Sequence, residues 1–382
     1  MSQIEKVRKM GRIRVIDTAR GIAIFGMVIG HMLNWWLTEQ DFWLYDVLSV
    51  YLFCFGAASF IFISGASATI SLKRGYMEIE KGDKFFMHLI KKMYFLRAFL
   101  LLIISLIYNF VVALAFQDFM WIWSWNFLQT IAISLFLIWP LLKTSKIFRT
   151  IVGIMVLIIN ELLLAFLLPF QGQLNFYGVV FYILYNPLYL YILLPFFSAF
   201  VFGTVLGDIL HNLNLIEDLK KKKATFKTHL IVSSLLGMIL LITGMFFLPD
   251  FTIHASFASM TYSLGLILVV YSILMYYEIF EPIKLKEKHR FFYYYNYYSF
   301  TIFIAHNPLY FLFYRQLTVI TIWIPIIITM IIVSILVIIV YKKLGPKASI
   351  TVGISVISFF LATTKEQRKM LIKMKKERET GD

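Results

Sequence analysis

Cysteine and charge are both scarce in this sequence. The single cysteine, Cys54, excludes an intramolecular disulfide and leaves the redox compartment open. Only 15% of the 382 residues are charged, whereas 60% are hydrophobic and 18% are aromatic. A soluble domain of this composition would expose an enormous apolar surface, so the sequence predicts a polytopic membrane protein.

Several motifs of known chemistry are missing as well. The sequence has no glycine-rich phosphate loop, no Gly-x-Ser-x-Gly elbow and no His-Glu-x-x-His. It also has no cluster of cysteine, histidine and carboxylate at metal-ligand spacing, so we expect no metal. The net charge of +15 does not imply nucleic acid, because the basic residues collect between the apolar runs as the positive-inside rule describes.

Apolar runs of about twenty residues predict about ten transmembrane helices. The expected fold is therefore an all-α integral membrane bundle of 10 spans, or 11 if the shorter run Ser349–Leu361 also crosses. The expected spans are Ile16–Leu37, Leu48–Leu72, Tyr94–Phe116, Trp121–Leu142, Ile147–Phe170, Leu188–Leu206, His229–Leu248, Phe257–Ile279, Tyr297–Tyr314 and Thr318–Tyr341.

Basic residues occur in alternate connections between the spans, which predicts the orientation. The segment before the first span is rich in lysine and arginine, whereas the next connection carries only acidic charges. This asymmetry places the N-terminus in the cytoplasm of a cell-membrane protein. Residues 1–15 then form a basic N-terminus, 16–341 one membrane domain, and 342–382 a short apolar segment with a basic tail. Spanning by Ser349–Leu361 would put that tail outside, so a re-entrant or peripheral segment is favoured.

The first span carries polar residues that are expensive inside a bilayer. Arg20 and His31 are eleven residues apart, close to three helical turns, so both project from nearly the same face roughly 16 Å apart along the axis. Asp17 and Asn34 fall near that face, which must then contact protein or a water-filled cavity. An Asp17–Arg20 pair that only anchors the helix end, with His31 as a packing residue, is an equally weighted alternative.

A second histidine, His306, lies midway along the expected ninth span. Asn307 and Pro308 follow it, which predicts a kink whose freed backbone groups need partners. Two imidazoles at membrane depth could serve as a base and the group that orients it.

Other polar residues at membrane depth have simpler explanations. Ser64 belongs to a small-residue seam in the second span, and the ordinary role of such a seam is close helix packing. Asn126, Gln129 and Glu161 need internal partners, and pairing between helices explains Glu161 at least as well as a role in a site. The tryptophans at the extracytoplasmic ends are explained by an aromatic belt more readily than by sugar stacking.

The stretch Val15–Ala23, with Arg20 and His31, resembles the first-helix signature of the transmembrane acyltransferases. These include the acyltransferase 3 and the heparan-alpha-glucosaminide N-acetyltransferase families. Further stretches are similar in order and spacing to segments of these proteins, and they are Phe60–Ser71 followed by Lys73 and Arg74, Phe127–Ala132, Pro195–Gly207 and Ser299–Pro308. The fourth-helix segment and the short basic stop after the second span are closer to the heparan branch.

The sequence also departs from that branch. Its lysosomal members use a histidine in the region after the first helix, and Leu37–Tyr45 contains none, so the heparan substrate is not carried over. His31 instead matches the acyltransferase 3 histidine. Phe303 stands where the late segment usually has tyrosine.

The resemblance implies a multi-pass acyltransferase. It would move an acyl group, expected to be acetyl, from cytoplasmic acetyl-CoA to a hydroxyl or amine of an extracytoplasmic glycan or glycolipid. His31 would be the general base, with Asp17 holding Arg20 in place. The expected donor-binding residues are Arg20, Lys73, Arg74 and Arg97, and the expected substrate or supporting residues are Asn34, Ser64, Asn126, Gln129, Glu161 and His306.

Two other functions stay open on the residues alone. One is a transporter whose midplane histidines relay protons or bind substrate, although no paired halves with interrupted helices are visible. The other is a binding or lipid-organising protein without chemistry. The expected partners are the lipid bilayer, acyl-CoA and a carbohydrate acceptor, and the sequence does not decide whether the chain forms an oligomer.

Overall fold

A computed structural model describes residues 13–77, 84–185, 192–247, 255–280 and 291–368. Most of the expected basic N-terminus and most of the basic tail lie outside these residues. The described chain is helical, with one isolated β-bridge between Leu37 and Leu317. The expected all-α class is confirmed.

The helices follow one another with short connections. They are α2 (Arg14–Trp36), α3 (Trp43–Leu48), α4 (Cys54–Met77), α5 (Lys84–Phe116), α6 (Phe127–Ile138), α7 (Lys146–Leu167), α8 (Phe176–Tyr185), α9 (Leu193–Asn214), α10 (Leu219–Phe246), α11 (Phe257–Phe280), α12 (Phe291–Tyr297), α13 (Ser299–Ala305), α14 (Trp323–Lys343) and α15 (Ile350–Ala362). Among the described residues, nine helical stretches are long and apolar enough to cross a membrane.

These nine stretches correspond to the expected spans with one exception. The expected span Tyr297–Tyr314 is not a continuous helix, because α13 ends at Ala305 and a 3₁₀ turn, Asn307–Phe311, follows. Pro308 in that turn has no N–H and cannot continue an α-helix. Ser349–Leu361 forms α15, which is too short to cross a bilayer unaided.

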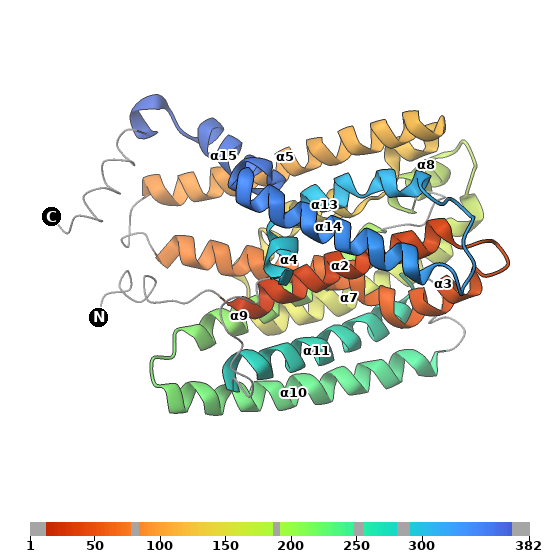
Figure 1. Ribbon diagram of the computed structural model, residues 1–382. Coiled ribbons are helices and arrows are strands. Elements are labelled where there is room, and N and C mark those ends of the chain that lie inside the picture. Colours follow the sequence, from red (N-terminus) through yellow and green to blue (C-terminus); the bar gives the residue numbers. More distant parts are fainter. Residues whose placement is uncertain (1–12, 78–83, 186–191, 248–254, 281–290, 369–382) are drawn as a thin grey trace.

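The helix α2 lies at the centre of the bundle. It contacts α4, α11, α12 and α13, which come from both halves of the chain. In Figure 1, α10 and α11 lie side by side along one edge, α5 lies at the opposite edge, and α2 runs between them. The polar face of α2 therefore faces protein, as the cost of burying charge in lipid requires.

Two kinds of helix surround this centre. Large apolar side chains are exposed along much of α5, α7, α10 and α14, which suits contact with lipid. By contrast, α9 is buried over most of its length and packs closely on α4. A Cβ added at Gly65 or Gly203 would overlap the backbone of the other helix, so the small-residue seam of α4 serves close packing.

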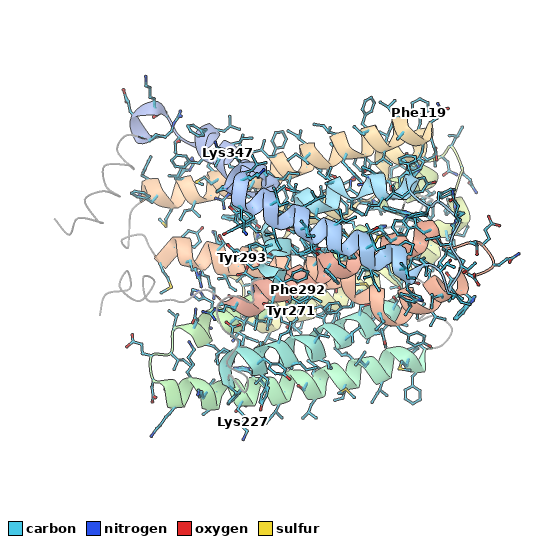
Figure 2. The ribbon with its side chains drawn as sticks, viewed as in Figure 1. Phe119, Lys227, Tyr271, Phe292, Tyr293 and Lys347 are labelled. Atoms are coloured by element: carbon cyan, nitrogen blue, oxygen red, sulfur yellow. The ribbon has the colours of Figure 1, made fainter. Side chains whose placement is uncertain are left out.

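The two ends of the bundle differ in charge. Lys73 at the end of α4 and Arg149 at the start of α7 both pair with Asp208 near the end of α9, so these three termini share one side. Figure 2 shows Lys227 and Lys347 toward that end and Phe119 at the opposite end. The lysines of α10 begin on the same side, directly after α9.

Candidate functional site

Arg20 lies near the start of α2 and reaches two other helices. Its Nη2 donates to Ser67 Oγ of α4 at 2.7 Å, and its Nη1 donates to Asn296 Oδ1 of α12 at 3.3 Å. Asn296 in turn donates from Nδ2 to Asp17 Oδ1 at 2.8 Å. The guanidinium also lies 5.4 Å from the centre of the Phe60 ring. Asn296 thus links Asp17 to Arg20, and the guanidinium is held from several directions.

Asn296 was not predicted as a site residue. It lies in the run Phe291–Tyr298, whose composition predicts an interfacial aromatic belt. The only signal in the sequence is that Asn296 is the one non-aromatic residue of that run. Glu278 of α11 was missed as well. Its carboxylate accepts hydrogen bonds from the backbone N–H groups of Arg14 at 2.8 Å and Val15 at 2.5 Å, and so fixes the first turn of α2.

A second charged group lies further along α4, at the same end of the bundle. Lys73 Nζ is 2.5 Å from Asp208 Oδ1, and Arg149 Nη2 bonds the other oxygen of this carboxylate. Arg149 is 1% exposed and also donates to the carbonyl of Thr204. Lys73, predicted to contact a donor, is therefore already engaged by Asp208. Sequence reasoning missed Arg149 and Asp208, because both lie at the boundaries of the expected spans Ile147–Phe170 and Leu188–Leu206, where charged residues are ordinary.

The other two predicted donor-binding residues are Arg74 and Arg97. Arg74 follows Lys73 in α4, and Ser67, the partner of Arg20, precedes Lys73 by six residues, or about 9 Å of helix. Arg97 projects from α5, half-buried, and its Nε has no hydrogen-bond partner among the described residues. Cations from α2 and α4 thus gather at one end of the bundle.

The two midspan histidines meet. The ring centres of His31 and His306 are 4.9 Å apart, although the residues lie 275 positions apart in the sequence. Trp35, one turn after His31, stacks on His306 with 5.5 Å between ring centres and 17° between planes. Tyr310 packs edge-on against Trp35 at 5.7 Å. A tryptophan expected in a lipid-facing belt therefore forms one wall of the histidine site.

Backbone hydrogen bonds hold the two histidine segments together. Arg315 N–H donates to the Trp35 carbonyl at 2.9 Å, and Leu317 N–H donates to the Trp36 carbonyl at 2.8 Å. Trp36 Nε1 donates to the Leu309 carbonyl at 2.7 Å. These three hydrogen bonds join the end of α2 to the irregular segment after His306. They restrict how far the two imidazoles can separate.

His306 itself is 6% exposed, whereas His31 is half-buried. Nδ1 of His306 is hydrogen-bonded to the Ile302 carbonyl at 3.1 Å, and Nε2 has no hydrogen-bond partner among the described residues. The next residue, Asn307, accepts a hydrogen bond from the Tyr108 hydroxyl of α5 at 3.1 Å. Asn34, one turn beyond His31, hydrogen-bonds Tyr45.

The remaining predicted residues have structural partners. Ser64 donates to the Phe60 carbonyl of its own helix at 2.9 Å. Glu161 accepts from Phe257 N–H at 2.7 Å and so caps α11. Asn126 caps α6 through the N–H of Gln129, and both side chains bond Asn109 of α5. These contacts explain all four residues by pairing between or within helices.

The fold and these two clusters define a polytopic membrane protein with cations at one end of a central helix and paired imidazoles further along it. The family model described as heparan-alpha-glucosaminide N-acetyltransferase, catalytic, matches residues 12–249. This is more than half of the chain, so the protein belongs to that family and is a multi-pass membrane acyltransferase. No curated protein and no solved structure matches it.

The matched region contains α2 to α10, with Arg20, His31 and the Lys73–Asp208–Arg149 cluster. His306 and Asn296 lie beyond it. Each of them contacts a polar residue of α2, so the last third of the chain completes both ends of the site.

Proposed function

We propose that this protein transfers an acyl group, expected to be acetyl, from cytoplasmic acyl-CoA to a hydroxyl or amine of an extracytoplasmic glycan or glycolipid. The observation that carries the proposal is the layout of α2. Its start holds a guanidinium that is fixed from α4 and α12, and three turns further on its histidine meets a second histidine.

The cationic end suits the donor. Arg20 has a bidentate geometry that matches phosphate oxygens. Lys73 and Arg149 share the single carboxylate of Asp208, and Arg74 follows Lys73 in α4. Arg97 adds a further cation on α5. A donor whose phosphates bind at this end can extend its acyl arm along α2, because Arg20 and His31 are roughly 16 Å apart on nearly the same face.

The histidine end suits the acceptor. His31 takes the proton from the acceptor oxygen or nitrogen as that atom attacks the acyl carbon. The bond from the acyl carbon to sulfur breaks as the new bond to oxygen or nitrogen forms. The sulfur leaves as a thiolate and is then protonated, so that the proton released by the acceptor is matched by the proton of the free thiol.

The acceptor that we propose for this protein is not taken from the family name. Members named for heparan act on a glucosaminide, and this chain lacks a histidine in Leu37–Tyr45, where the lysosomal members have theirs. Mass spectrometry of envelope glycans and lipids from cells with and without the protein tests the proposal directly. An acyl mass that disappears with the protein identifies the acceptor, and identical spectra would contradict acyl transfer to the envelope.

A single variant tests the role of the base. His31→Gln keeps size and hydrogen bonding but cannot take a proton, so it should lose about 10²–10⁴-fold in transfer rate while retaining donor affinity. Purified protein, [¹⁴C]acetyl-CoA and an alkyl glucosaminide or glucoside as probe acceptors provide the assay. Turnover of His31→Gln at the wild-type rate would exclude the acid–base role of His31.

A further inference from the structure

The hydrogen bonds of His306 determine which of its nitrogens carries a proton. Nδ1 lies 3.1 Å from the Ile302 carbonyl, and a carbonyl oxygen can only accept. Nδ1 must therefore be protonated and donate. In a neutral imidazole the other nitrogen, Nε2, then carries a lone pair and is an acceptor.

No described residue donates a hydrogen bond to that acceptor. Nε2 of His306 is buried without a hydrogen-bond partner among the described residues, and the residue as a whole is 6% exposed. A buried acceptor without a donor is costly, so such atoms in folded proteins generally have a functional or structural reason. A protonated Nε2 would be worse, because it would add an unpaired charge to the same apolar surroundings.

The nearest polar ring is that of His31. At 4.9 Å between centres, no side chain fits between the two imidazoles. Trp35 stacks on His306 and also packs 4.9 Å from His31, so it closes one side of the pair. His31 is half-buried, and its ring plane is tilted by 54° from that of His306.

We propose that His306 is the positioning residue for His31, and the proposal rests on the acyl transfer proposed above. When substrate is bound, one nitrogen of His31 donates its N–H to Nε2 of His306, and the lone pair of the other nitrogen is directed at the acceptor. This follows the general arrangement in which a base is oriented by a third group, and such bonds are often long in the absence of substrate. The acceptor proton then moves to His31, and the bond to His306 stabilises the imidazolium that forms.

The first experiment measures which nitrogen of His306 is protonated. This measurement does not depend on enzyme activity. Full-length protein labelled with ¹⁵N-histidine in lipid nanodiscs gives nitrogen resonances by NMR, and the His306→Gln variant assigns those of His306. We expect a protonated Nδ1 and an unprotonated Nε2. A protonated Nε2 with a bare Nδ1 would overturn the proposal even if the enzyme is active.

Two substitutions then separate positioning from packing. His306→Phe keeps a ring beside Trp35 but has no acceptor atom, whereas His306→Gln loses the ring and offers an amide oxygen that can accept from His31. Positioning predicts that kcat falls about 10²-fold in the phenylalanine variant with KM for acetyl-CoA nearly unchanged, and that glutamine recovers most of the loss. Packing alone predicts the opposite order, and that order would overturn the proposal.

Controls keep the two proposals distinct. Thermal unfolding of each variant in detergent identifies any that fail to fold. Either variant that folds assigns the His306 resonances, which then decide the question in the wild-type protein. If the wild-type protein transfers no acyl group to any acceptor, the proposed function fails. If it does transfer and His306→Phe is as active as wild type, only the positioning role of His306 fails.

Discussion

At the scale of single residues, the sequence predicted which polar groups matter on α2 but not what they contact. Arg20 and His31 were found from their spacing, which needs only the geometry of one helix. Their partners Ser67, Asn296 and His306 lie 47 to 276 positions away in the sequence, and no local pattern records such pairings. The distribution of charge predicted a cytoplasmic end rich in cations, but not that Asp208 would bind two of them.

The fork geometry of Arg20 leads to the first prediction. Arg20→Lys keeps the charge but cannot donate to Ser67 and Asn296 at once in a planar fork, so acetyl-CoA affinity should fall by about tenfold or more. Asn296→Ala should weaken binding in the same direction, because it removes the link between Asp17 and Arg20. Isothermal titration of purified protein with acetyl-CoA measures both variants. Unchanged affinity in both would leave Arg20 as an anchor of the helix end.

The carboxylate of Asp208 leads to the second prediction. Asp208→Asn removes the carboxylate that pairs with both Lys73 and Arg149, and an uncompensated buried charge typically costs about 3–5 kcal/mol. The melting temperature in detergent should fall sharply. The double variant Asp208→Leu, Arg149→Met removes both buried charges and should recover part of the loss. A double variant no more stable than Asp208→Asn would mean that unpaired charge is not the cause.

At the scale of elements, hydropathy predicted nearly every long helix and failed where the backbone is irregular. A window of twenty residues averages over Ser299–Pro308 and cannot register that the α-helix ends at Ala305. Pro308 signalled a kink, and the structure shows a full break into a 3₁₀ turn. Irregular backbone at membrane depth occurs where it is buried in protein, and here it is joined to the end of α2 and places His306 beside His31.

The contact of α4 with α9 leads to the third prediction. A Cβ at Gly65 would overlap the Phe200 carbonyl, so Gly65→Ala should force the helices apart and cost about 1–3 kcal/mol. Gly56 in the same helix has nothing within 4 Å of its added Cβ, so Gly56→Ala is the matched control and should hold or raise stability. Melting temperatures in one detergent measure both variants. Equal losses would show that close packing at Gly65 is not what alanine disturbs.

At the scale of the whole molecule, composition predicted a membrane protein, and apolar runs of about twenty residues predicted that it is all-α, because runs of that length satisfy their backbone in lipid as helices. Sequence also predicted that alternate connections share a side. The ion pairs of Asp208 join the end of α4, the start of α7 and the end of α9, as that alternation requires. What it could not provide is the order in which helices pack around α2, since that depends on side-chain fit between distant segments.

The sidedness of the bundle leads to the last prediction. The start of α7 lies at the end rich in cations, and α7 runs to Leu167, so Gln171 lies at the far end. Lys221, near the start of α10 and directly after α9, lies at the cationic end. Because the positive-inside rule places that end in the cytoplasm, an impermeant thiol reagent should label Gln171→Cys in intact cells, and Lys221→Cys only after permeabilisation.

Both variants are made in a Cys54→Ala background, so that each protein carries one thiol, and both positions are exposed, so access of the reagent depends on the membrane alone. The reverse pattern would invert the orientation and place the Arg20 end outside, where cytoplasmic acyl-CoA cannot reach it. Labelling of both sites in intact cells would contradict a bundle with Gln171 and Lys221 on opposite sides of the membrane. The expected pattern leaves Arg20 accessible to a cytoplasmic donor and directs the histidine pair toward the other face.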